Sequence, residues 1–203
     1  ACGRACFGSD MLPMNDAGIA GARYGKVAMA FHWVIAVLIV LNFLSAWAAQ
    51  DQPRAVAMQI MGNHKAFGLT ILALSVLRIA WRFVHRPPPL SEQLKAWEAA
   101  VAKVTHTLFY FLMIAIPLAG WAMVSSAGGG KPVSVFGRFD VPALPFAHDK
   151  ATADTFHDVH ETLAALMLLL LALHVGAALK HQFVDRDTTL ARMVPFLSRR
   201  PRG

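Results

Sequence analysis

The sequence predicts an all-α integral membrane protein, a bundle of four transmembrane helices. Of its 203 residues 56% are hydrophobic and only 15% are charged, whereas a soluble domain carries about a quarter charged residues. The apolar residues gather in four long stretches. Each stretch is long enough to cross about 30 Å of hydrocarbon at about 1.5 Å per helical residue. Basic residues flank these stretches, as expected for membrane topology.

The expected helices cover approximately residues 27–49, 66–84, 104–124 and 162–183. A short polar loop, DQPRAVAMQIMGN, follows the first, and a Pro-Pro-Pro stop at 87–89 follows the second. The third loop, 125–159, is rich in Gly and Pro.

We expect one membrane domain over 23–195, preceded by a disordered or non-native head at 1–22 and followed by a basic cytoplasmic tail at 196–203. The head holds both cysteines, too few for a thiolate metal site, and lacks the apolar core of a signal peptide.

The distribution of Lys and Arg predicts the orientation in the membrane. Fourteen of the nineteen lie in the N-terminal tail, the second loop region and the C-terminal tail, and five lie on the other side. By the positive-inside rule both termini are cytoplasmic. The net charge of +7 raises nucleic acid as a partner. However, the basic residues form no stripe with interleaved aromatics, so we expect no nucleic-acid binding.

Histidines placed inside the apolar stretches are the main functional signal, because ionisable residues are costly in hydrocarbon. His64 and His160 begin the second and fourth predicted helices at the same depth. His174 follows His160 by fourteen residues, about 1400° of helix rotation and about 21 Å of rise, so both rings leave one face. His32 lies at a depth where it can face His174.

Two histidine pairs, His64–His160 and His32–His174, would hold two b-type haems stacked along the membrane normal of a four-helix bundle. Arg78 follows His64 by the same interval of fourteen residues and is placed to pair with a haem propionate. His106 and Lys103 are further candidates at that level.

Two alternatives remain open from the residues alone. His181 shares the face of His174, and depth does not choose between them. His157 is a weaker rival to His160, because it points about 100° away from the direction of His174.

Five stretches resemble the prokaryotic cytochrome b561 family of di-haem membrane cytochromes: RYGKVAMAFHW, NHKAFGLTILALSVLRIAWR, THTLFYFLMIAIPLAGW, SVFGRFDVPALP and HETLAALMLLLLALHVGAALKHQF. The resemblance runs from Arg23 to about Pro195. It implies haem iron ligation by His32, His64, His160 and His174, and places His181 near the cytoplasmic haem, where a quinone binds. It further implies a multi-pass protein of the bacterial inner membrane.

The resemblance implies electron transfer across the bilayer to or from a quinone such as ubiquinone. One hypothesis is a superoxide oxidase, which takes electrons from superoxide at the periplasmic side. Lys65, beside His64, could attract that anion, although aspartates on the same face oppose it. A second is a non-catalytic electron-relay subunit docked to a dehydrogenase or hydrogenase through the third loop. A third is a metal-ion transporter, disfavoured by the scarcity of Asp and Glu within the spans.

Overall fold

The structure, a computed structural model, describes residues 24–85, 88, 95–187 and 189–194. The predicted head at 1–22 and tail at 196–203 lie outside the described residues, as do Pro87 and Pro89 of the predicted stop.

The prediction of an all-α membrane bundle is confirmed, since four helices are long and apolar enough to cross a membrane. The helices are α1 (Lys26–Gln50), α2 (Arg54–Val84), α3 (Ala96–Ala127) and α4 (Lys150–Lys180). A π-helical turn, His181–Asp185, continues α4, and a short 3-10 helix, Leu190–Arg192, follows it. The third loop adds a small hairpin, β1 (Val133–Val135) and β2 (Phe139–Val141), where the sequence predicted only loop.

The second and fourth helices begin earlier than the apolar pattern predicts. His64 and His160, expected at helix starts, each lie ten residues past the first residue of their helix. Polar side chains stabilise the added turns of α4. Asp149 caps the helix by accepting from the backbone N–H of Thr152 at 2.8 Å, and this bond lowers the pKa of Asp149. Hydropathy therefore marks where a helix leaves hydrocarbon and not where it ends.

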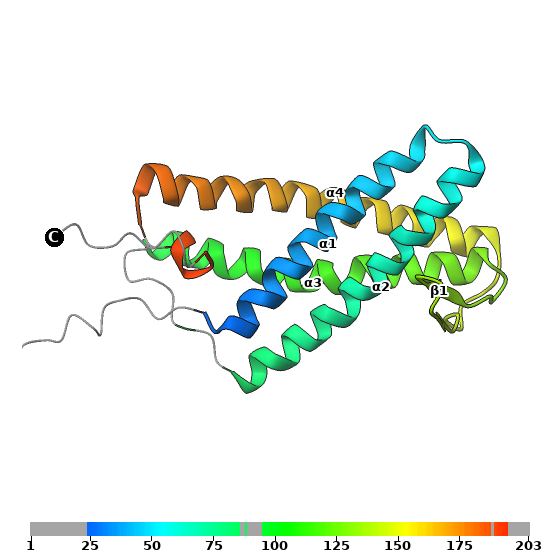
Figure 1. The fold of residues 1–203 in the computed structure, drawn as a ribbon, viewed down its shortest axis with the longest axis horizontal. Helices are drawn as coiled ribbons and strands as arrows, with labels where there is room; N and C mark the ends of the chain where they lie inside the picture. Colours follow the sequence, from blue (N-terminus) through cyan, green and yellow to red (C-terminus); the bar gives the residue numbers. More distant parts are fainter. Residues whose placement is uncertain (1–23, 86–87, 89–94, 188, 195–203) are drawn as a thin grey trace, which may run out of the picture.

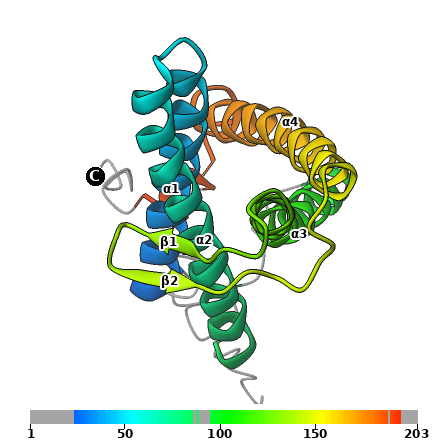
Figure 2. The ribbon, with the colours of Figure 1, turned by 90° about the vertical axis from the view of Figure 1, so that its right-hand side faces the viewer.

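The four helices pack as two pairs. α1 runs along α2, and α3 runs along α4, while α2 also contacts α3. No comparable run of backbone contacts joins α4 to α1 or α2 among the described residues. Figure 2 shows α1 and α2 on one side of the bundle and α3 and α4 on the other. Side chains fill the middle, and the buried core cluster consists of Ile35, Ile71, Leu112, Met113, Met167 and Leu170.

The bundle has two distinct ends (Figure 1). At the hairpin end lie the α1–α2 connection, the hairpin and the start of α4. At the opposite end, here called the tail end, α1 begins and the segment after α4 folds back. The indole Nε1 of Trp33 donates to the carbonyl oxygen of Met193 at 3.0 Å. This bond fixes the segment after α4 against α1.

The hairpin lies against α2. Val135 pairs with Phe139, and the turn between them has Phe136 at φ 52° and Gly137 at φ 65°. Two consecutive positive φ angles are typical of a type I′ hairpin turn. The Phe136 ring contacts Phe67 of α2 with centroids 5.5 Å apart. Phe67 is three residues past His64, so the hairpin is anchored beside the turn of α2 that carries this histidine.

Two hydrogen bonds anchor the chain after β2 to α3. Trp121 donates from Nε1 to the carbonyl oxygen of Pro142 at 3.1 Å. The backbone N–H of Leu144 donates to Ser125 Oγ at 3.0 Å. The third loop is therefore held on two sides, by α2 and by α3.

Candidate functional site

The structure brings the predicted histidines together in two pairs. At the hairpin end, His64 of α2 and His160 of α4 have ring centroids 6.1 Å apart with an interplanar angle of 71°. At the tail end, His32 of α1 and His174 of α4 have centroids 6.5 Å apart with an angle of 65°. Both pairs bridge the two halves of the bundle, since each joins α4 to α1 or α2.

Hydrogen bonds define which ring nitrogen is available at the hairpin end. His160 Nδ1 lies 2.9 Å from the carbonyl oxygen of Ile116, and His64 Nδ1 lies 3.1 Å from that of Asn42. Because a carbonyl oxygen only accepts, each Nδ1 carries the proton and donates. The lone pair of a neutral ring is then on Nε2. A histidine that binds a metal through one ring nitrogen usually donates a hydrogen bond from the other to a carbonyl or carboxylate, which fixes the tautomer and the orientation of the ring.

His64 has an additional polar neighbour. Ser45 Oγ donates to the carbonyl oxygen of Asn42 at 2.7 Å and lies 3.3 Å from His64 Nδ1. Two oxygen atoms of α1 therefore surround the donating nitrogen of His64. This orients the ring from the adjacent helix.

The spacing of the rings fits an iron between them. A metal–imidazole bond is about 2 Å long, and about 1 Å more separates each nitrogen from its ring centre, which gives about 6 Å between centres. The observed 6.1 and 6.5 Å agree with this requirement.

The space at the hairpin-end pair has the chemistry that an apolar macrocycle requires. All four helices contribute to a cavity there, and most of its lining is apolar. The lining residues are Ile39, Asn42, Phe43, His64, Ile71, Met113, Ile116, Pro117, His160, Ala164 and Met167. A flat apolar group with its iron between the histidines therefore fits the residues present.

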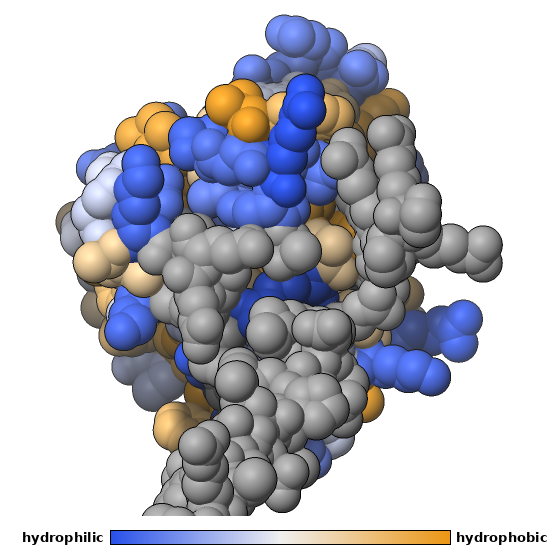
Figure 3. All heavy atoms as spheres, turned by 90° about the vertical axis from the view of Figure 1, so that its left-hand side faces the viewer, coloured by the Kyte–Doolittle hydropathy of each residue, from blue (hydrophilic) through white to orange (hydrophobic). Residues whose placement is uncertain are grey.

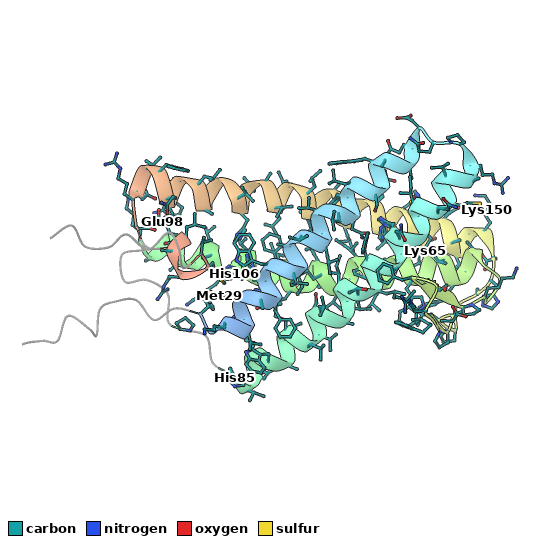
Figure 4. The ribbon with its side chains drawn as sticks, in the orientation of Figure 1. Met29, Lys65, His85, Glu98, His106 and Lys150 are labelled. Carbon is teal, nitrogen blue, oxygen red and sulfur yellow. The ribbon has the colours of Figure 1, made fainter. Side chains whose placement is uncertain are left out.

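A third histidine converges on the tail-end pair. The ring centroid of His106 on α3 lies 6.0 Å from that of His174, and the ring centroid of Phe109 lies 5.2 Å from it. Figure 4 shows His106 toward the tail end of the bundle. Because α3 and α4 are packing neighbours, His106 approaches from beside His174, whereas His32 faces it from the other half. The hairpin-end pair also spans the two halves, so His32 is the structural counterpart of His64.

Arg78 lies where its register with His64 placed it, toward the tail end of α2. Its guanidinium carbon lies 5.5 Å from the ring centre of Tyr110 on α3, and that of Arg82 lies 5.7 Å from the same ring. Neither arginine forms an ion pair with a described residue. Arg78 and Arg82 thus lie beside one aromatic ring without a carboxylate partner among the described residues. They form a local positive region that is suited to bind the carboxylates of a cofactor.

His181 belongs to a different environment from the paired histidines. Its Nδ1 lies 2.7 Å from Asp187 Oδ2 and 3.1 Å from Asp185 Oδ2. Asp185 also pairs with Lys180 at 2.6 Å. A π-helical turn begins at His181, but the backbone N–H of His181 still donates to the carbonyl oxygen of Ala177, so the register of α4 changes only after this residue. The structure thus places His181 in an ionic cluster at the end of α4, apart from the ring pair at His174.

Sequence reasoning missed the residues that hold the histidine rings. Neither Ile116 nor Asn42 carries a signal, because it is their backbone carbonyls that accept the hydrogen bonds. One signal was present in the sequence: Pro117 and Gly120 interrupt an otherwise helix-favouring apolar run. Both residues are costly inside helices and therefore call for a local reason.

Comparison with known proteins agrees with this geometry. Residues 23–196 match the family model described as prokaryotic cytochrome b561. "Cytochrome b561 homolog 2" of Escherichia coli (strain K12) is 35% identical over 177 residues, which cover 85% of this chain and 91% of the relative. "Probable superoxide oxidase CybB" of Yersinia pestis is 29% identical over 173 residues, 85% of this chain and 96% of the relative. The chain belongs to the prokaryotic cytochrome b561 family, whose members are membrane electron-transfer proteins.

Proposed function

We propose that this chain is a di-haem cytochrome b that transfers electrons across the bilayer and reduces a quinone with electrons from superoxide. The observation that carries the proposal is the pair of histidine couples, 6.1 and 6.5 Å between ring centres, one toward each end of a transmembrane bundle. Haem, when bound, would supply one-electron transfer. The chain's own residues hold the cofactor and orient its ligands.

Four histidines would serve as iron ligands: His64 with His160, and His32 with His174. In the hairpin-end pair the two Nδ1–H groups already donate hydrogen bonds to backbone carbonyls. Arg78 would stabilise a haem carboxylate at the tail end. The metal-ion transporter hypothesis gains no support from the paired arrangement, because the one group of His and carboxylate side chains close enough to share a metal among the described residues, Glu98, His181 and Asp185, includes neither pair.

We infer that the tail end lies in the cytoplasm. This is the end that the positive-inside rule assigns to the cytoplasm, and hydrophilic side chains gather on its described surface (Figure 3). The hairpin end would then face the periplasm.

The quinone would bind at the tail end beside His181. Reduction of a quinone to a quinol consumes two electrons and two protons, so a proton donor is needed next to the ring. Asp187 holds His181 through Nδ1 at 2.7 Å and is itself fixed by the backbone N–H of Thr189 at 2.8 Å. A histidine held by a carboxylate in this way is suited to donate a proton from Nε2.

Superoxide would donate its electron at the hairpin end. Lys65, Lys131 and Arg138 lie there without an ion pair to any described residue, whereas Lys150 pairs with Asp154. The unpaired cations provide local attraction for a small anion. Overall, two superoxide anions would be oxidised to O₂ while one quinone and two protons become one quinol. A relative with the printed name of a probable superoxide oxidase supports this donor.

The deciding experiment measures haem content and then the electron donor. Two b-type haems per purified polypeptide are expected, and superoxide should drive quinone reduction that superoxide dismutase abolishes. Two haems that superoxide does not reduce would favour the relay subunit instead. The exposed aromatic side chains of the third loop, Phe136, Phe139 and Phe146, would then be its docking surface. No haem after reconstitution would end the proposal.

A further inference from the structure

The hydrogen bond between His160 and Ile116 requires close approach of a side chain to the backbone of a neighbouring helix. His160 Nδ1 lies 2.9 Å from the carbonyl oxygen of Ile116. In a regular helix the same carbonyl accepts from the N–H four residues on, at Gly120. A carbonyl oxygen has two lone pairs and accepts both bonds, provided that nothing projects from residue 120 into the path of the ring.

Gly120 leaves that path open. A Cβ built at this position would lie 3.0 Å from both Cε1 and Nδ1 of His160, closer than nine in ten real Cβ contacts, so the ring would have to shift by a few tenths of an ångström. The other glycines inside the transmembrane helices contrast with it. A Cβ at Gly62 or Gly176 would meet nothing within 4 Å, and one at Gly68 would make only an ordinary contact, 3.9 Å from Asn42 Nδ2.

The ring has little freedom to yield. On one side Ile116 holds Nδ1, and across the bundle His64 lies with its ring centre 6.1 Å away. A side chain at position 120 would therefore push the ring away from α3. The immediate effects would be a longer bond to Ile116 and a displaced Nε2.

The hydrogen bond from His160 to the Ile116 carbonyl changes how strongly His160 would bind a metal. Donation from Nδ1–H to a carbonyl makes Nε2 a stronger electron donor to a bound metal. Stronger donation favours the oxidised, more positive iron over the reduced form. Weakening the bond therefore raises the reduction potential at this pair and lowers affinity, and loss of such an outer partner typically costs about 10–100-fold in affinity or activity.

We propose that Gly120 is a positioning residue for the hairpin-end haem: its missing side chain lets His160 reach the Ile116 carbonyl and so sets the orientation and donor strength of this ligand. The proposal rests on the proposed role of His160 as an iron ligand. His174 has no corresponding hydrogen bond among the described residues. The tail-end pair thus offers an internal reference within the same protein.

The test uses two substitutions of increasing size at Gly120 and matched ones at Gly176, which lies two residues from His174 and faces open space. Haem per polypeptide and the two midpoint potentials are measured in the purified holoprotein. In G120A we expect the hairpin-end potential to rise and its haem to dissociate faster, by about 10-fold or more. In G120V we expect one haem per chain. G176A and G176V should behave as the wild type.

Four results separate the possible failures. Wild-type potentials and two haems in both Gly120 variants would overturn the proposal. Loss of both haems in G120A would also overturn it, because the effect would not be local to His160; circular dichroism and the tail-end haem report whether the bundle is intact. The variant H160A is measured in parallel. If H160A keeps two haems, the ligand assignment itself is wrong. If H160A loses one haem and the Gly120 variants do not, only the role of Gly120 is wrong.

Discussion

His64 and His160 face each other with ring centres 6.1 Å apart, although they lie on α2 and α4, which are not packing neighbours. Each ring donates from Nδ1 to a backbone carbonyl of a third or fourth helix. All four helices therefore contribute to this one pair. Such convergence has a chemical explanation if the two Nε2 atoms share a metal.

We expect H160A and H64A each to reduce the haem content from two per chain to one. Without one histidine of the pair, only the other would hold the haem iron, and haem retention would weaken. The measurement is haem per polypeptide with the reduced-minus-oxidised spectrum. H157A is the matched control, since His157 is exposed and lies beside Asp158 and Glu161. Equal haem loss in H157A would show that the effect is not ligation.

At the tail end we expect H32A to lose one haem and H106A to keep both. The ring centre of His32 lies 6.5 Å from that of His174, across the bundle. The ring centre of His106, on the neighbouring helix α3, lies 6.0 Å from that of His174. Haem content of the two purified variants decides between them. The opposite result, with H106A losing a haem and H32A intact, would reassign the ligand to α3.

The variant R78Q should retain two haems but lower the tail-end midpoint potential. Removing a cation destabilises the reduced, more negative centre by on the order of 1 kcal/mol at an effective dielectric constant of about 20, or about 40 mV for one electron. Redox titration measures the shift. R82Q is the control: Arg82 lies one turn further toward the tail end and is exposed, so its effect should be smaller. A larger shift in R82Q would contradict the placement of Arg78.

H181A should keep two haems and lose quinone reduction, because His181 lies in an ionic cluster with Asp185 and Asp187 and outside both ring pairs. Loss of a general acid typically lowers a rate by about 10²–10⁴-fold. D187N should give a smaller loss, since it removes the charge that orients the ring. Steady-state quinol formation is the readout. Full activity in H181A would move the quinone site elsewhere.

Charge reversal in K65E should slow superoxide-driven reduction at low ionic strength, with the difference shrinking at high salt. Electrostatic steering raises association rates by about 10–10³-fold and is screened by salt. Lys65 adjoins His64 and forms no ion pair with a described residue. K150E is the control, because Lys150 already pairs with Asp154. A salt-independent defect in K65E would indicate damage to His64 instead of lost steering.

The site could be predicted only in part, and particular residues show why. His160 and His174 are fourteen residues apart on one helix, so periodicity alone places both on one face. The same reasoning set Arg78 in register with His64. The prediction was wrong for the start of α4, where polar capping extends the helix beyond its apolar span.

The sequence by itself determined the four apolar helices, the level of each histidine and the family to which the chain belongs. The helices and the histidine levels follow from local hydropathy and helical period, which depend on neighbouring residues alone, whereas the family follows from the resemblance of five stretches of the sequence. Only the tertiary structure decided which backbone carbonyl orients each ring, that His106 joins His174, and that the hairpin lies on α2. Such contacts join segments that are far apart in the chain. In the bond from His160 to Ile116 the acceptor is a backbone atom that every residue has, and its availability depends on the missing side chain of Gly120.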